Sequence, residues 1–596
     1  MTLLSDAPAP VGHPRPTGAA ARMRRAARTA RRARPAPITA FWLLIVAILV
    51  LPILLFLLVA FSPRLLDQGP QWFTLTSFSQ ALQGPLLVGL RNSLIVGSCS
   101  AVLAAALGFG VAWVVLRTDL PGRRLWSGSM FALLLAPSYL IALGWERLLE
   151  PSGVLDVFGF HSGVPRDIFY GPVGIIAVLT VKGLPFAYLA ISSALRGLGS
   201  EFEAAARVHG SGTLAATRVV VSLLAPAMWS ALAIVFAESV SDFGVASTLA
   251  NDSHFPVATF VLYDAVDNFP VNFPVAAAVG WALMAMAGLA LLAQSRALRG
   301  RSYRVLGGRS RPARRHRLRL MPRLASIAVM TALVVLALGV PVFGAVSASL
   351  LSGLGSFAES HSVTLTNYQR ALSSPDLRGP LLYSASLATI TATITVLLGV
   401  VSARLLTERG GKFSARLLDM LLLAAVALPG IVFAAGYIFT YNLPLVNSVG
   451  VHLYETTTLL VLGYLATALP STARVLTGSV GQIQHSLREA ARVHGIGAIG
   501  SWARAVLPVL MRPLIAAWTL TFAATLLELP VSELLYPPDH PPVSVGITKE
   551  LSTYDFGGGT AMEVVAVLVA LVVVAAAFGV FRLLAPAGWR RIGSTS

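Results

Sequence analysis

The sequence predicts an all-α membrane protein with about twelve spanning helices, arranged as two six-helix halves that repeat one another. Of its 596 residues, 56% are apolar and only 12% are charged, with a mean hydropathy of +0.74, whereas soluble globular chains are about 25% charged. Apolar runs of about 20 residues, long enough to cross a bilayer as a helix, recur from end to end. Short motifs of the first half also return in the second.

Composition excludes several classes of site and partner. The single cysteine, Cys99, excludes a disulfide framework, a cysteine-based zinc site and an iron–sulfur cluster. The net charge of +19 comes mainly from arginines clustered at 22–34 and 296–323. A long apolar segment follows each cluster, so the positive-inside rule accounts for both and no nucleic-acid partner is expected. Residues 1–40 are predicted to be an Arg-rich cytoplasmic arm before an uncleaved first helix.

The predicted spans fall into two sets of six. The first half, 41–295, holds spans near 41–61, 89–116, 125–146, 172–196, 227–250 and 275–295. The second half, 324–596, holds spans near 324–350, 381–406, 416–440, 456–478, 512–530 and 561–585. A basic linker, 296–323, joins the halves.

Loop composition predicts the orientation. The loops 117–124 and 407–412 and the linker 296–323 are rich in Arg and Lys, whereas loop 251–275 has three Asp and no Lys or Arg. Basic loops stay on the cytoplasmic side. We therefore expect a multi-pass protein of the cytoplasmic membrane with both termini and the linker inside.

The repeats predict a parallel duplication. The string RVHG occurs at 207–210 and again at 492–495, and the span 92–113 is echoed by 383–404. FAESVSDFG (236–244) is similar to LLELPVSEL (526–534), which places Glu238 opposite Glu528 and Asp242 opposite Glu533. Two halves of equal topology assemble around an axis along the membrane normal, with any translocation path at their interface.

Each half also carries an unusually long cytoplasmic loop. The second reads HSLREAARVHGIGAIGSWARAVLPVLMRP (485–513). Ala490 and Ala491 allow close packing of a short helix, Gly495 allows a bend free of Cβ restriction, and Pro508 marks the return towards the membrane. Crossing a bilayer does not require such a structure, so we expect it to bind a partner; the alternative is an amphipathic helix on the lipid surface.

This loop resembles the EAA loop in the permease subunits of ABC-type importers. The second copy fits that pattern position by position, at Glu489, Ala490, Ala491, Gly495, Leu507 and Pro508. The first copy, in the loop 200–226, departs from it: Glu203 precedes Gly210 by seven residues, and Ala204 stands where the second copy has its glutamate. Its matching residues are Glu203, Ala205, Ala206 and Gly210.

The resemblance implies a type I ABC importer permease fold and a non-enzymatic role. Both loops would be coupling helices that sit on two copies of an ATPase subunit, while an exported substrate-binding protein would deliver cargo at the outer face. The chain itself would bind no cofactor. Its Gly410-Gly411-Lys412 lacks the rest of a phosphate-binding loop, so ATP would be used by the partner subunits.

A single chain with two such loops looks most like the ferric-iron importer family, which carries a stretch similar to ESVSDFG (238–244). Importers of thiamine, 2-aminoethylphosphonate, sulfate or polyamines share this architecture and remain alternatives. Fe³⁺ favours carboxylate or tyrosinate oxygen, and carboxylates at membrane depth are candidates for function. The candidate path residues are Glu238, Asp242, Glu528 and Glu533. The alternative for Glu238 and Glu528 is hydrogen bonding to backbone freed by a helix break.

Other classes fit less well. An ion-gradient-driven secondary transporter would explain the duplication and the buried carboxylates but not the paired cytoplasmic loops. A membrane-embedded enzyme would need a nucleophile–base arrangement, and neither HExxH nor GxSxG is present. His209 and His494 fall in the cytoplasmic loops and His254 and His540 in outer loops, so no soft-metal site is expected.

Overall fold

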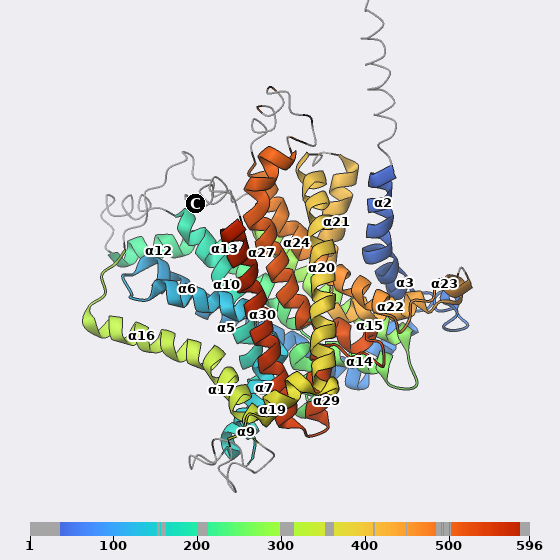
Figure 1. The fold of residues 1–596 in the computed structure, drawn as a ribbon, viewed down its shortest axis with the longest axis horizontal. Helices are drawn as coiled ribbons and strands as arrows, with labels where there is room; N and C mark the ends of the chain where they lie inside the picture. The colour runs from blue at the N-terminus through green and yellow to red at the C-terminus, as the bar shows by residue number, and fades with distance from the viewer. Residues whose placement is uncertain are drawn as a thin grey trace, which may run out of the picture.

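The protein is described by a computed structural model. It describes residues 36–151, 155, 162–198, 213–298, 315–351, 363–408, 412–448, 450–483, 490, 493, 497, 500 and 502–584. Over these residues the chain is helical, with two isolated β-bridges and no strand. Figure 1 shows the long helices of both halves running side by side, as expected for an all-α membrane protein.

The first half begins with one long span built of three helical segments and continues through five further spans and their connecting helices. Its elements are α2 (Ala36–Ile45), the π-helical segment η1 (Val46–Val50), α3 (Leu51–Val59), the short 3₁₀ turn η2 (Arg64–Leu66), α4 (Thr76–Ala81), α5 (Gly84–Arg117), α6 (Arg123–Leu135), α7 (Ser138–Leu148), α9 (Gly163–Phe169), α10 (Pro172–Gly197), α12 (Thr213–Leu223), α13 (Ala225–Ser241), η3 (Ala246–Ala250), α14 (Ala258–Asp267) and α15 (Phe273–Leu298).

The second half repeats this order. Its elements are α16 (Leu320–Val334), η4 (Val335–Gly339), α17 (Val340–Ser349), α19 (Thr366–Ser373), α20 (Pro375–Glu408), α21 (Phe413–Val426), α22 (Gly430–Tyr441), α23 (Pro444–Ser448), α24 (Thr457–Gly481), η5 (Trp502–Val506), α27 (Leu507–Leu526), α28 (Pro530–Leu535), α29 (Val543–Ser552) and α30 (Phe556–Leu584).

Twelve apolar segments of the described chain coincide with the twelve predicted spans. Nine helices are long and apolar enough to cross a membrane, two bent pairs of helices add one span each, and Ala225–Ser241 is a shorter apolar helix. They fall six to a half. The predicted fold class is confirmed.

The third span of each half is broken, which the sequence analysis did not predict. The helices α6 and α7 meet at an angle of 100°, and α21 and α22 meet at 107°. Pro137 and Pro429 stand at these breaks with extended backbone. A proline lacks the N–H that would continue a helix, and it disfavours helical backbone in the residue before it. The fifth span also stops early in each half, at Ser241 and at Leu526.

Matching contacts in the two halves support the duplication. At the start of α14 the backbone N of Ala258 donates to Ser93 Oγ, and at the start of α29 the backbone N of Val543 donates to Ser384 Oγ, both at 2.8 Å. Both serines come from the second span of their own half. The fourth spans, α10 and α24, also carry an interior proline at corresponding places, Pro185 and Pro470.

The first span of each half packs on the bent span of the other half. Tyr437 Oη of α22 donates to the carbonyl oxygen of Ile48 (2.9 Å), and Tyr441 Oη of the same helix donates to that of Ala47 (3.2 Å). In the same way, α17 of the second half packs on α7 of the first half. The two backbones approach so closely that a Cβ would not fit at Gly144 or at Gly344. These reciprocal contacts join the halves, because each bent span is held by a helix from across the interface.

This close approach gives a stability prediction. Gly344→Ala should lower the free energy of unfolding by about 1–3 kcal/mol, because its methyl group would meet the carbonyl oxygen of Gly144, which belongs to rigid helical backbone. Thermal unfolding of the detergent-purified chain measures the effect. Gly110→Ala is the matched control, since nothing lies within 4 Å of a Cβ there. Equal midpoints for the two variants would contradict the packing described.

The end of the linker between the halves is attached to the first half. The backbone N of His316 donates to the carbonyl oxygen of Arg117 (2.8 Å), and that of Leu318 donates to Asp119 Oδ1 (3.0 Å). The latter hydrogen bond lowers the pKa of Asp119 below its ordinary value. The buried Arg117 in turn donates to the carbonyl oxygen of Leu198 (2.9 Å), so the linker is anchored beside the end of α10.

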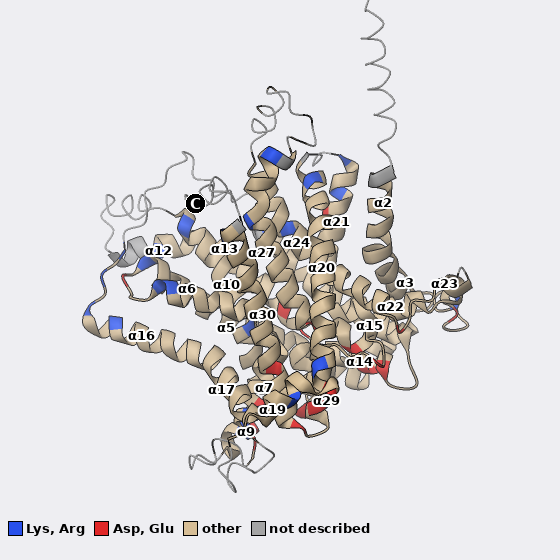
Figure 2. Ribbon diagram, in the orientation of Figure 1, with Lys and Arg blue, Asp and Glu red and all other residues tan. Residues whose placement is uncertain are grey.

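Charge is distributed unevenly between the two ends of the helical bundle. Figure 2 shows Lys and Arg mainly around α12, α16 and the first turns of α21 and α27, and Asp and Glu mainly near α14 and α29. The basic end is the one from which α13 and α27 enter the bundle after the two long loops.

Candidate functional site

A cavity of about 360 Å³, lined by apolar residues and a few charged ones, lies between the two halves. Its lining includes four charged residues and two residues at helix breaks: Lys182, Glu238, Asp242, Glu528, Ser138 and Gly430. Three come from helix breaks in the first half or directly beside them, and two come from breaks in the second half. The cavity also meets the segments of α6, α13, α21 and α27 that precede the breaks, so it lies on the basic side of the breaks.

The four breaks meet at the floor of this cavity. In the first half, a Cβ on Gly244 would touch the backbone N of Tyr139 (3.0 Å). In the second half, a Cβ on Gly430 would meet Cβ of Pro530 (3.1 Å). The broken third span and the shortened fifth span therefore touch each other at the same level in each half. Broken helices next to a cavity are typical of substrate paths in membrane transporters. The backbone N–H and C=O groups that lose helical hydrogen bonds at a break are tolerated only where they find other hydrogen-bond partners.

Asp242 satisfies the backbone at its own break. Its Oδ1 accepts from the backbone N of Val245 (2.8 Å), and its carbonyl oxygen accepts from Thr259 Oγ1 of α14 (2.9 Å). The side chain thus acts as an N-cap for the turn that starts at Gly244.

Glu528 does the same in the second half. Its carboxylate accepts from the backbone N of Val531 (3.0 Å) and of Ser532 (3.1 Å), and its carbonyl oxygen accepts from Ser544 Oγ of α29 (2.5 Å). Thr259 and Ser544 occupy the second position of α14 and α29. Asp242 and Glu528 are therefore the structurally equivalent pair, and both line the cavity.

The pairing expected from the sequence was wrong. It placed Glu238 opposite Glu528, four residues out of register, and Asp242 opposite Glu533, five residues out of register. Both ESVSDFG and LELPVSEL contain two acidic residues at similar spacing, so string similarity aligned the first acid of each. The hydrogen bonds to the capped turns fix the true register instead. In that register Ala524, which also lines the cavity, stands opposite Glu238.

Glu238 and Glu533 have different surroundings. Glu238 lies on the last turns of α13, its side chain is exposed to the cavity, and no described residue forms a hydrogen bond with it. Glu533 lies on α28 outside the cavity lining, and its Oε2 is buried with no partner among the described residues. The structure thus brings Glu238, Asp242 and Glu528 to one cavity and leaves Glu533 outside it.

The lining also includes Lys182 and Tyr139, neither of which the sequence analysis named as a candidate. Lys182 projects from α10, and its Nζ donates to the carbonyl oxygen of Ala136 (3.0 Å). Tyr139 is the second residue of α7, and its hydroxyl is buried with no partner among the described residues. A lysine in the middle of a predicted span is a signal that could have identified Lys182, since such residues face the interior of a bundle. Nothing in the sequence distinguishes Tyr139 from other aromatic residues.

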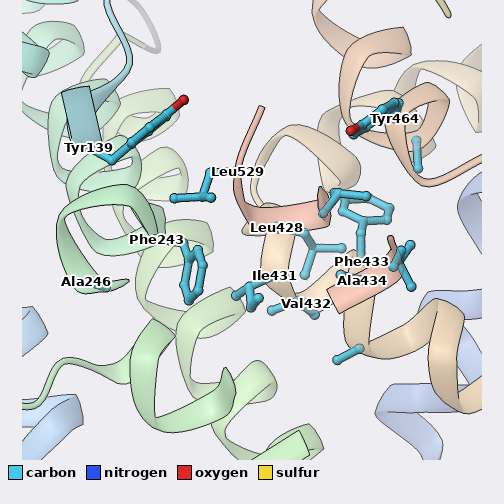
Figure 3. Close-up of a cluster of buried hydrophobic side chains, with 14 of the residues drawn as sticks. Tyr139, Phe243, Ala246, Leu428, Ile431, Val432, Phe433, Ala434, Tyr464 and Leu529 are labelled. Carbon is cyan, nitrogen blue, oxygen red and sulfur yellow. The ribbon is translucent and has the colours of Figure 1, made fainter. Parts of the chain in front are cut away.

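Beyond the breaks the interface is apolar and tightly packed. Figure 3 shows Phe243 facing Ile431 and Leu428 across the interface, with Leu529 above them. Phe243 is 1% exposed and Ile431 is fully buried. The cavity therefore ends at this layer, and hydrophobic side chains from both halves separate it from the acidic end of the bundle.

Seven of the ten candidate coupling residues in the two long loops lie outside the described part of the chain. These are Glu203, Ala205, Ala206, Gly210, Glu489, Ala491 and Gly495. Ala490 is described as helical and exposed. Leu507 begins α27 and Pro508 is buried at its second position, where the missing N–H costs nothing. The role of these loops in coupling remains a prediction.

Comparison with known proteins identifies relatives of this fold. Residues 395–589 match the family described as binding-protein-dependent transport system inner membrane component. The chain is 23% identical over 515 residues to the ferric transport system permease protein FbpB of Actinobacillus pleuropneumoniae, covering 83% of this chain and 71% of that protein. It is also 23% identical to the Fe(3+)-transport system permease protein FbpB 2 of Haemophilus influenzae, over 80% of this chain and 87% of the relative.

A shorter relative matches about one half. The sulfate transport system permease protein CysT of Salmonella typhimurium is 25% identical over 226 residues, which is 37% of this chain but 80% of the relative. Most of that single protein thus corresponds to a part of this chain about the size of one predicted half.

Proposed function

We propose that this chain, a permease of the binding-protein-dependent ABC importers and of the ferric transport type, forms the translocation path for ferric iron and couples it to ATP hydrolysis by separate subunits. The observation that carries the proposal is the cavity between the halves, where Glu238, Asp242 and Glu528 gather beside four helix breaks. A path at the interface of two repeats is the arrangement expected for a transporter built by duplication.

Ferric iron is favoured over an anionic cargo by the charge of the cavity lining. Three carboxylates and one lysine line it, and carboxylate oxygen is a hard ligand suited to a hard cation. An oxyanion such as sulfate would meet an excess of negative charge in a medium of low dielectric, where repulsion between like charges is strong. The broad similarity to permeases named for ferric transport points the same way.

The halves are proposed to extend over 41–295 and 324–596, with the linker 296–323 between them and the arm 1–40 before them. The described ends of the predicted coupling loops 200–226 and 485–513, which are α12 and the start of α27, lie at the basic end of the bundle, which we assign to the cytoplasm. The cavity lies on that side of the breaks, and the apolar layer around Phe243 closes the opposite side. The structure then corresponds to an inward-facing state.

Cysteine labelling tests this orientation. In a Cys99→Ala background, Asn268→Cys should react with a membrane-impermeant maleimide applied to intact cells, whereas Arg317→Cys should react only after the membrane is opened. Both positions are exposed, so a difference in their labelling shows that they lie on opposite sides of the membrane. The reverse labelling pattern would place both termini outside and overturn the assignment.

Copurification tests the partners. The tagged full-length chain should copurify from its native membrane with an ATPase that carries a Walker motif, present as two copies for each permease. An exported binding protein should join the complex in the presence of its cargo. A chain that drives uptake without any ATPase would support the secondary-transporter alternative and contradict the proposal.

A further inference from the structure

Lys182 holds a positive charge inside the bundle at the wall of the cavity. It lies near the middle of the 26-residue helix α10, and its ammonium is fixed by one hydrogen bond to the carbonyl oxygen of Ala136, directly before the break at Pro137. An ammonium at membrane depth is costly unless it is compensated. The compensating groups therefore matter more than the single hydrogen bond.

The compensation comes from the first half alone. Lys182 interacts electrostatically with Glu238 and Asp242. It forms no ion pair shorter than 4 Å with either carboxylate in the described part of the chain. Asp242 is already occupied by the amide of Val245, whereas Glu238 keeps its oxygens free towards the cavity. Lys182 thus acts as a counter-ion without a direct ion pair and leaves Glu238 open to a ligand.

The second half has no such lysine. Counting three residues before the matched prolines Pro185 and Pro470 leads to Lys182 in α10 and to Thr467 in α24. Thr467 donates to the carbonyl oxygen of Tyr464 in its own helix (3.2 Å) and does not line the cavity. Glu528 is compensated instead by the amides at the start of α28. The two halves therefore balance their cavity carboxylates in different ways.

We propose that Lys182 is a specificity-determining residue, a tethered cation that balances Glu238 and Asp242 in the empty cavity and so prevents common divalent cations from binding there. A divalent ion that approaches Glu238 is repelled by the fixed ammonium. It therefore gains less binding free energy than it would from two uncompensated carboxylates. A trivalent ion gains more binding free energy from the same two carboxylates, because the Coulomb attraction grows with the charge of the ion. The inference rests on the proposed cation path and adds a reason why cations of lower charge do not bind there.

Binding of Mn²⁺ to the purified full-length chain tests this role without iron. Removing the ammonium in Lys182→Met should strengthen Mn²⁺ binding at least about tenfold over the unmodified chain, measured from the electron paramagnetic resonance signal of the free ion. Adding Glu238→Gln to Lys182→Met should abolish the gain, because the free carboxylate is then gone. Lys182→Arg keeps the charge and should bind Mn²⁺ as weakly as the unmodified chain does.

Two controls separate this role from a structural one. Thr467→Met, at the equivalent place in α24, should leave Mn²⁺ binding unchanged. Lys182→Gln replaces Lys182→Met if the latter fails to fold, and the same tenfold gain is expected. Equal Mn²⁺ binding by the unmodified chain and either uncharged variant would overturn the inference. Failure of the intact importer to take up iron would contradict the proposed function. The Mn²⁺ binding experiment does not depend on that uptake, so the two failures can be told apart.

Discussion

Glu238→Gln should lower uptake of ferric iron at least about tenfold while the chain still inserts into the membrane. Glu238 is exposed to the cavity and has no hydrogen-bond partner among the described residues. The amide therefore keeps the shape of the side chain and removes its charge without breaking a hydrogen bond to a described residue. That charge offsets part of the cost of removing water from a cation in a low-dielectric passage. Uptake is measured in cells that express the whole importer.

Glu533→Gln is the matched control. Glu533 is also an acidic residue near a break, but it lies on α28 outside the cavity lining. Uptake by this variant should stay within about twofold of the unmodified importer. Glu528→Gln is less informative, because Glu528 also caps α28 and its change alters structure and charge together. Full uptake by Glu238→Gln would show that the carboxylate does not take part in transport.

Gly495→Val and Glu489→Lys should each abolish cargo uptake while the chain still inserts into the membrane. If Gly495 forms the bend between two short helices, a β-branched residue there costs about 1 kcal/mol or more. Glu489→Lys reverses a charge on the face predicted to dock on the ATPase. Uptake in cells and the amount of ATPase that copurifies with the tagged chain measure the two effects.

A second glycine of the same loop provides the control. Nothing lies within 4 Å of a Cβ built on Gly497, so Gly497→Val should retain more uptake and more bound ATPase than Gly495→Val. If Gly495→Val and Glu489→Lys both transport as the unmodified chain does, the loop is not a coupling element.

The spans could be predicted from the sequence because each is a long apolar run, and this signal depends only on local composition. The breaks inside them could not be placed in the same way. Pro137 and Pro429 break their helices, whereas Pro185 and Pro470 lie within continuous ones. A proline in an apolar run permits either outcome, and the tertiary contacts at each site decide which occurs.

The site could be predicted in part. Because carboxylates are rare in apolar spans, the sequence predicted Glu238, Asp242 and Glu528 as path residues, and all three line the cavity. Their pairing between the halves was wrong because equivalence depends on which carboxylate caps the turn after the break, a three-dimensional relation that string similarity does not contain. Lys182 was overlooked because its importance comes from Glu238 and Asp242, which lie on another helix.

Uptake by the reconstituted importer tests the central claim most directly. The chain, its ATPase and its binding protein would be placed in liposomes, and accumulation of radioactive iron and of radioactive sulfate would be measured with and without ATP. The account predicts accumulation of iron that requires ATP and the binding protein, is lost in Glu238→Gln, and is accompanied by no accumulation of sulfate. Accumulation of sulfate without iron, unchanged in Glu238→Gln, would contradict it.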